Sequence, residues 1–200
     1  MFIKAIAAGT AWFLVPTMAA AHHAMDGQLP DSLMSGLLSG LGHPIIGWDH
    51  LAFVLGIGAL SALAGLGAGP VVAFVAGTVA GCLFHVGGVD LPAAELAIAL
   101  SLLGLAAAVA LGRGQGPLMP VAMGLAGLFH GYAYGESIVG AEATPLVAYL
   151  VGFALIQAAI GLGAARLVDW LANGRAGDVT GLARVTAGLL VLAGAAALVA

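Results

Sequence analysis

The stretch HPIIGWDHLAFVLGIGALSALAGL, residues 43 to 66, decides the fold class of this chain. Residues 51–66 carry no charge and are apolar enough to enter a bilayer. His43, Asp49 and His50 stand at the start of the stretch, before that run. Imidazole and carboxylate groups at membrane depth are costly, so they usually have a function. The stretch therefore predicts a transmembrane helix that opens on a functional site.

The composition of the whole chain is that of a membrane protein. Of its 200 residues, 62% are hydrophobic and only 7% are charged, whereas about a quarter of the residues in a soluble domain are charged. The 32 glycines predict helices that pack closely in lipid. The single cysteine, Cys82, excludes a disulfide within the chain. A net charge of -4 without a basic block argues against nucleic acid as a partner.

The first 21 residues are typical of a secretory signal peptide. Lys4 supplies a positive charge, residues 5–15 form a short apolar core, and the alanines at 19–21 offer a cleavage site. The alternative is an uncleaved first transmembrane helix, but Pro16 follows a core that is too short to span easily. Cleavage after Ala21 is therefore expected.

The rest of the chain predicts an all-α integral membrane protein with a six-helix transmembrane bundle. Apolar runs alternate with short turns, at the spacing that a hydrocarbon core of about 30 Å requires. The predicted organisation is a signal peptide (1–21), a periplasmic N-terminus (22–45) with a short interfacial helix (31–41) capped by Asp31, and a six-span domain (46–200). The predicted spans are 46–66, 70–88, 92–111, 117–138, 144–167 and 183–200.

The arginines orient this bundle. All of them lie in or beside the connections on one side of the predicted spans: Arg113, Arg166, Arg175 and Arg184. The connections on the other side contain Asp90, Glu136 and Glu142 but no lysine or arginine. The positive-inside rule places the arginines in the cytoplasm. The sequence thus predicts a multi-pass protein of a bacterial inner membrane, with both mature termini outside.

Small residues recur four positions apart in the predicted helices. Such pairs let helix backbones approach closely where lipid gives no hydrophobic drive to associate. They predict a compact bundle, and they offer faces through which copies of the chain could form a homo-oligomer. The pairs are Gly36 and Gly40, Gly77 and Gly81, and Gly131 and Gly135.

In this topology every histidine maps to the outer half of the protein, together with most of the carboxylates. A gathering of imidazole and carboxylate groups predicts a metal-binding or proton-carrying site on that side. The histidines are His22, His23, His43, His50, His85 and His130.

The motif HPIIGWDH allows two interpretations. Pro44 suits the first position of a helix, which would make His43 the capping residue. Seven residues separate His43 from His50, nearly two helical turns, so both rings could face one direction with Asp49 beside them. Alternatively, Asp49 serves the helix dipole and the histidines lie at headgroup level. Because Asp49 would then lie beyond the first turn, where the dipole has little effect, a ligand role is favoured.

Further candidates lie in the later spans. His130 and Tyr134 share a helix face, and Glu136 closes the same segment, although His130 could simply donate to a carbonyl of a neighbouring helix. Glu95 lies one turn into a span, where it could be only a favourable charge at a helix N-terminus. The remaining candidates are two supporting groups at a turn, His85 and Asp90, and a chelating pair at a newly cut amino terminus, His22 and His23.

Imidazole and carboxylate groups without a cysteine pair suit borderline divalent ions such as Ni²⁺, Co²⁺, Zn²⁺ or Cu²⁺. They do not suit copper(I) or iron–sulfur clusters, which require sulfur ligands. The sequence has no P-loop, GxSxG or HExxH motif, which argues against an enzyme. We therefore expect a transported or bound metal and no tightly held cofactor.

Three segments resemble the HupE/UreJ family: HPIIGWDHLAFVLGIGAL (43–60), PAAE (92–95) and FHGYAYGE (129–136). The first is similar to the family's HPxxGxDH signature, and with the leader and six spans the likeness covers essentially the whole chain. The resemblance implies a secondary permease for nickel, or in some lineages cobalt, that serves hydrogenase or urease maturation. Many relatives carry a second histidine where this chain has Tyr134, which removes one candidate nitrogen ligand. Carried over to this chain, the family's important polar positions are His43, Asp49, His50, Glu95, His130 and Glu136.

Two alternatives to transport stay open. The inner half of the predicted bundle shows no polar relay, which favours a membrane metal-binding or assembly factor that presents metal to an enzyme without transporting it. A structural small subunit of a larger membrane complex would depend on the glycine faces and not on the histidines. The lipid bilayer is a partner in every case.

Overall fold

A computed structural model describes residues 28–112, 116–174 and 178–199, and in that part of the chain it contains seven α-helices and no strand. The prediction of an all-α protein is confirmed. The predicted signal peptide, His22, His23, Arg113 and Arg175 lie outside the described residues. The helices are α1 (Leu33–Ile46), α2 (Trp48–Leu63), α3 (Gly69–Val86), α4 (Ala94–Ala110), α5 (Leu118–Gly135), α6 (Ala143–Asn173) and α7 (Val179–Ala197).

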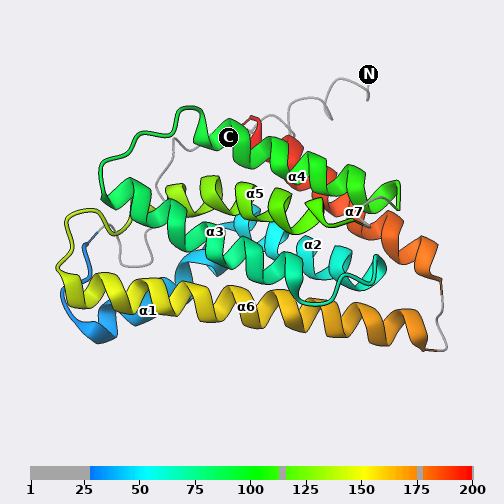
Figure 1. Ribbon diagram of the computed structural model, residues 1–200, viewed down its shortest axis with the longest axis horizontal. Helices are drawn as coiled ribbons and strands as arrows, with labels where there is room; N and C mark the ends of the chain where they lie inside the picture. Colours follow the sequence, from blue (N-terminus) through cyan, green and yellow to red (C-terminus); the bar gives the residue numbers. More distant parts are fainter. Residues whose placement is uncertain (1–27, 113–115, 175–177, 200) are drawn as a thin grey trace, which may run out of the picture.

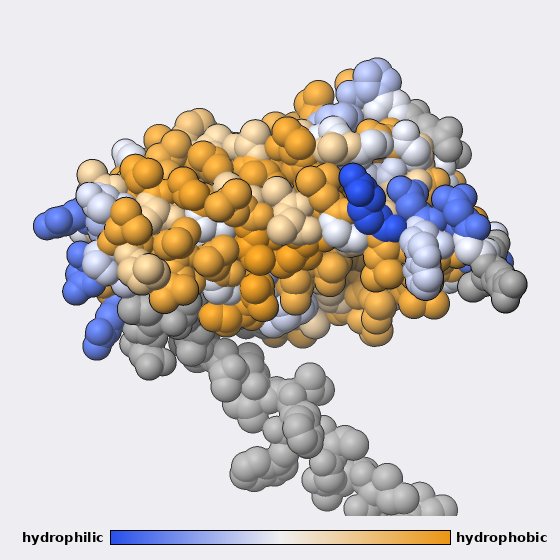
Figure 2. All heavy atoms as spheres, turned by 90° about the horizontal axis from the view of Figure 1, so that it is seen from below, coloured by the Kyte–Doolittle hydropathy of each residue, from blue (hydrophilic) through white to orange (hydrophobic). Residues whose placement is uncertain are grey.

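Apolar side chains cover the middle of the molecule. On the face seen in Figure 2, a broad hydrophobic belt separates hydrophilic residues at the two ends of the long axis. Among the described helices, α3, α6 and α7 are each long and apolar enough to cross a membrane. The pair α1 and α2 passes the same test jointly, with a bend of 78° between them, and α4 is a shorter apolar helix. The membrane character is supported, and the count of six spans stays a prediction.

Helices α1 and α2 follow one another beside the long helix α6 (Figure 1). A Cβ atom at Gly40 of α1 would collide with the backbone of Tyr149, early in α6. A Cβ atom at Gly58 of α2 would collide with the backbone of Gly161, later in α6. Both helices therefore contact α6, α1 near the start of α6 and α2 farther along it.

The first helix begins and ends later than predicted. Its N-cap is Ser32 and not Asp31, because Ser32 Oγ accepts a hydrogen bond from Ser35 N at 3.2 Å while Ser35 Oγ accepts one from Ser32 N at 3.0 Å. This reciprocal capping box satisfies two backbone donors at once. The helix then continues past residue 41 to Ile46. Its predicted place at the outer interface stays a prediction.

The predicted glycine pairs lie at helix contacts. A Cβ atom at Gly77 or Gly81 would collide with the backbone of α5, and one at Gly131 would collide with the backbone of Thr78 in α3. The pair in α1 fits against α6 in the same way. Close packing through these pairs is confirmed. Because the glycines contact helices of their own chain, they give no support to a homo-oligomer.

Two apolar clusters fill the described core. One joins α2, α3, α4, α5 and α7 and includes Phe53 and Phe74. The other joins α3, α5 and α6 and includes Tyr134, Tyr149 and Phe153. Aromatic rings from both clusters pack against buried histidines.

A candidate metal site at a helix break

The site forms at the break between α1 and α2. Helix α1 ends at Ile46, Gly47 links the two helices, and α2 begins at Trp48. The prediction that Pro44 opens a helix was wrong, because it lies in the last turn of α1. Proline has no N–H for the carbonyl four residues back, so it weakens a helix from that point on. The helix ends one turn after His43, whose carbonyl accepts from Gly47 N at 3.1 Å.

Asp49 lies in the first turn of α2, so its predicted place beyond the first turn was wrong. The difference arises because the helix starts at Trp48 and not at Pro44. Asp49 is half-buried, and its Oδ1 accepts a hydrogen bond from His50 N at 2.9 Å. A carboxylate in a first turn is stabilised by the partial positive charge of the helix end. Asp49 therefore interacts with the dipole of α2 at its start, which was the alternative interpretation of this residue. It does so directly beside His50.

Three histidines come together across the break. The ring centroids of His43 and His50 are 6.3 Å apart, and those of His50 and His130 are 5.0 Å apart. All three side chains are buried, with exposed fractions of 3%, 3% and 0%. His43 and His50 lie on different helices, so they do not share a helix face. The bend of 78° between α1 and α2 brings them together.

Hydrogen bonds through Ser101 fix the tautomers of two of these rings. Ser101 Oγ donates to the carbonyl of Ile98 at 2.7 Å, so the same oxygen accepts from His130 Nε2 at 3.0 Å. A neutral His130 then has no proton on Nδ1, and this atom accepts from His50 Nδ1 at 2.8 Å. The other ring nitrogen of His50, Nε2, consequently carries a lone pair.

A tyrosine fixes the tautomer of His43 in the same way. Tyr149 OH donates to the backbone oxygen of Tyr134 at 2.9 Å, so it accepts from His43 Nδ1 at 3.0 Å. The lone pair of a neutral His43 therefore lies on Nε2. Two imidazole nitrogens with lone pairs, one on each side of the break, are ligands that suit borderline divalent metals.

Aromatic rings enclose the histidines. The ring of Tyr134 is fully buried, and its centroid lies 4.8 Å from that of His43 and 4.5 Å from that of His50. Phe53 packs against His130 with ring centroids 4.5 Å apart. These rings bury the imidazoles, and the Tyr134 hydroxyl among them has no hydrogen-bond partner among the described atoms.

The predicted carboxylate ligands lie at the edge of the site or on the surface. Asp49 is half-buried, whereas Glu95 in the first turn of α4 and Glu136 at the C-cap of α5 are exposed. Among the described residues, no group of three or more His, Cys, Asp or Glu side chains is arranged to hold a metal ion. The coordination set therefore stays a prediction. The predicted ligands that the structure does bring together are His43, His50 and His130.

His85 and Asp90 belong to another cluster. The ring of His85 lies 4.3 Å from that of Tyr132, whose hydroxyl donates to Asp90 Oδ1 at 3.2 Å. Tyr132 connects these two residues at the exposed end of α3, and their predicted supporting role in metal binding stays a prediction.

Two residues that hold the histidines were not predicted from the sequence. Ser101 lies in the apolar run of α4 and Tyr149 in that of α6, and neither is adjacent to a histidine or a carboxylate in the sequence. A lone polar residue within an apolar helix is the signal that could have indicated them.

Comparison with known proteins agrees with the resemblance seen in the sequence. Residues 10–197 match the family described as HupE / UreJ protein. Protein HupE of Rhizobium leguminosarum bv. viciae is 34% identical over 190 residues, which cover 92% of this chain and 92% of that protein. No solved structure matches the chain. Because the family match extends over nearly the whole chain and includes the helix break with its histidines, this protein belongs to the HupE/UreJ family.

Proposed function

We propose that this protein is a secondary transporter that takes up a divalent transition metal from the periplasm, with nickel as the ion that the family resemblance favours. The observation that carries the proposal is the gathering of three buried histidines, His43, His50 and His130, at the break between α1 and α2. In this proposal the leader is removed after Ala21, six spans cross a bacterial inner membrane, and both mature termini lie outside. No catalytic step is assigned.

The break between α1 and α2 supports a transport role. Irregular backbone at membrane depth is tolerated where it lines a cavity or is buried in protein, and transporters use the ends of broken helices to hold ions. We therefore assign α1 and α2 to one broken span, in place of an interfacial helix followed by a separate span. Lipid would then cover the exposed apolar residues of α1, which are Leu33, Met34, Leu38, Ile45 and Ile46.

His130 acts in this proposal as an orienting residue. Both of its ring nitrogens are engaged, Nε2 with Ser101 and Nδ1 with His50. Metal-bound histidines are commonly held through their second nitrogen by such a partner, which fixes both the tautomer and the ring orientation. Tyr149 holds His43 in the equivalent manner. Direct ligation is thus assigned to His43 and His50.

The carboxylates balance the charge of the ion. A divalent ion without compensating charge is too costly in an apolar interior. Asp49 supplies one negative charge beside His50. Glu95 and Glu136 are exposed at helix ends on the predicted outer side, where they would raise the local concentration of cations before entry.

Reconstitution tests the proposal. Liposomes that contain the purified protein and an encapsulated nickel-sensitive dye should report nickel entry down an imposed gradient. His50→Ala is expected to abolish this signal while membrane insertion stays intact. Gly104→Ala adds a methyl group where no atom lies within 4 Å and should retain the signal. Unchanged uptake by His50→Ala would overturn the proposal.

A second function is favoured by one observation. Phe53 and Phe74 pack together with ring centroids 5.1 Å apart, and both contact His130, so aromatic side chains and no polar relay border this ring. This packing suits a membrane factor that binds metal and presents it to a partner enzyme. Such a protein would bind nickel in detergent by equilibrium dialysis and yet give no dye signal inside liposomes.

A further inference from the structure

Four residues have buried side-chain polar atoms without a hydrogen-bond partner among the described atoms: Ser61, His85, Tyr134 and Gln157. Tyr134 belongs to the histidine site and His85 to the cluster with Tyr132, which leaves Gln157 and Ser61. Gln157 of α6 is fully buried, and neither its Nε2 nor its Oε1 has a partner. Ser61 of α2 is 2% exposed, and its Oγ also lacks a partner. Buried polar groups in this state are destabilising, and an apolar residue of similar shape would be tolerated better. Their presence indicates a ligand or water that visits them.

Both residues lie between the histidine site and the opposite end of the molecule. Gln157 follows Tyr149 by eight residues, about 12 Å along α6. Ser61 follows His50 by eleven residues, about 16 Å along α2. Helix α2 meets α6 at Gly58 and Gly161, three residues before Ser61 and four residues after Gln157. A path from the histidines along this contact therefore passes Gln157 and then Ser61.

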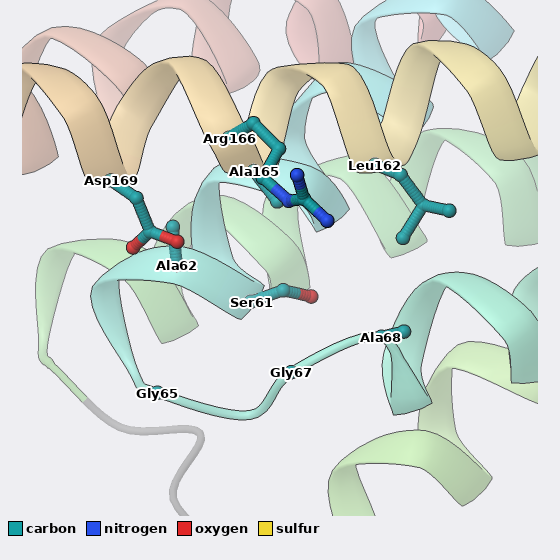
Figure 3. A pocket seen from close by; sticks show the side chains of 9 residues that line it. All are labelled: Ser61, Ala62, Gly65, Gly67, Ala68, Leu162, Ala165, Arg166 and Asp169. Carbon is teal, nitrogen blue, oxygen red and sulfur yellow. The ribbon is translucent and has the colours of Figure 1, made fainter.

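A pocket opens beside Ser61 (Figure 3). It has a volume of about 320 Å³ and lies between the end of α2, the turn at 65–68 and α6. Figure 3 shows the Ser61 hydroxyl reaching into this space, and Arg166 and Asp169 reaching toward it from α6. Both of these charged residues are exposed, so the pocket communicates with the end of the molecule that the arginines assign to the cytoplasm.

We propose that Gln157, Ser61 and Asp169 form the inward exit route of a divalent transition metal ion, which travels with part of its water shell to this pocket. This inference rests on the proposed transport function. Amide, hydroxyl and carboxylate oxygens hold borderline ions less tightly than imidazole does, which suits binding positions that an ion must leave. The positive charge of Arg166 beside the pocket weakens binding at the last position, Asp169, and favours release.

The route is closed in the conformation described. Between the levels of Gln157 and Ser61, α2 and α6 touch through Gly58 and Gly161, where a Cβ atom on Gly58 would collide with the backbone of α6. No long side chains interlock between two glycines, so a small sliding of α2 against α6 opens this contact. Inward release therefore couples to movement of the same helix that carries His50.

The test compares Gln157→Leu and Ser61→Ala with the wild-type protein in the liposome assay with the nickel-sensitive dye. Thr78→Val is the matched control, because the Thr78 hydroxyl is also buried but already donates to Val75 O at 2.8 Å. Each route variant is expected to slow nickel entry by about tenfold, as the loss of one polar contact from a transfer step implies. Nickel affinity in detergent should stay unchanged, and the melting temperature should equal or exceed that of the wild type.

Each outcome decides between the site and the route. Wild-type entry rates in both Gln157→Leu and Ser61→Ala would overturn the route and leave the histidine site standing. No entry in the wild-type protein itself would overturn the transport function, and the route with it. Equal slowing by Thr78→Val would trace the effect to packing and so overturn the route. If Gln157→Leu fails to fold, Ser61→Ala and Asp169→Asn decide, because Asp169 is exposed and its replacement leaves the core intact.

Discussion

The Nδ1 atoms of His50 and His130 lie 2.8 Å apart, although 80 positions separate the two residues in the sequence. This hydrogen bond continues through Ser101 to the carbonyl of Ile98. Since each hydroxyl and each neutral imidazole has only one proton to donate, the chain of bonds places the lone pair of His50 on Nε2. Helix α4 and helix α5 thus prepare a histidine of α2 for a metal ion.

If His130 orients His50 without binding the metal, His130→Ala should weaken nickel binding less than His50→Ala does. We expect a loss of about 10-fold to 100-fold in affinity, the range typical of removing the partner of a metal-bound histidine. Isothermal titration calorimetry on the detergent-solubilised protein measures the difference. Equal losses in the two variants would show that His130 is itself a ligand. Ser101→Ala should act in the same direction as His130→Ala, by removing the acceptor that holds His130.

Tyr149→Phe should reduce both stability and nickel affinity. The substitution leaves His43 Nδ1 without its acceptor and removes one of the donors to the Tyr134 carbonyl, which keeps a longer bond from Ser137 N at 3.4 Å. We expect a loss of about 1–3 kcal/mol in the free energy of unfolding, measured by thermal denaturation in detergent. Tyr132→Phe is the control, because its hydroxyl bonds Asp90 at an exposed position, and it should leave affinity unchanged. If Tyr149→Phe changes neither the stability nor the nickel affinity, His43 keeps its orientation without Tyr149.

Gly47→Ala should disturb the site without straining the backbone. The φ angle of Gly47 is -72°, which any residue adopts, but a Cβ atom there would lie 2.7 Å from His50 Cδ2. The imidazole must therefore shift, and nickel uptake should fall by about tenfold or more, because ligands displaced by a fraction of an ångström lose their geometry. Gly104→Ala has open space around its Cβ atom and should transport normally. Wild-type uptake by Gly47→Ala would place the metal away from His50.

Gly131→Ala should destabilise the fold through the contact of α5 with α3. The added methyl group would collide with the backbone of Thr78, which cannot yield as a flexible side chain can. Overpacking of this kind lowers the free energy of unfolding by about 1–3 kcal/mol. Gly188→Ala in α7 has no atom within 4 Å of its Cβ and should keep the wild-type melting temperature. Equal melting temperatures in the two variants would mean that α3 and α5 are less tightly joined than described.

The later helices could be predicted from the sequence because their lengths follow from apolar runs between turns. The span expected at 70–88 is the helix Gly69–Val86, and the span expected at 92–111 contains the helix Ala94–Ala110. The glycine pairs also indicated where helices touch, since only residues without a side chain permit such contacts.

The region of the histidine motif was harder to predict. Pro44 fits either the first turn of a helix or a last turn that is about to end, and local rules do not separate the two. Packing of α1 against α6 selects the second, because Gly40 and the residues around it fit against the backbone of Tyr149. With that choice the break moves to Gly47, and Asp49 moves into a first turn.

The sequence by itself determined that apolar helices form, that they pack closely, and that imidazole and carboxylate side chains, His43, His50 and His130 among them, are the costly residues of these helices. Only the tertiary structure decided how these rings are held. Their partners are Ser101 and Tyr149, and the bond from Tyr149 to His43 joins positions 106 residues apart. The physical reason is that a hydrogen bond depends on direction and distance, and these are set by how helices pack and not by the order of residues along the chain.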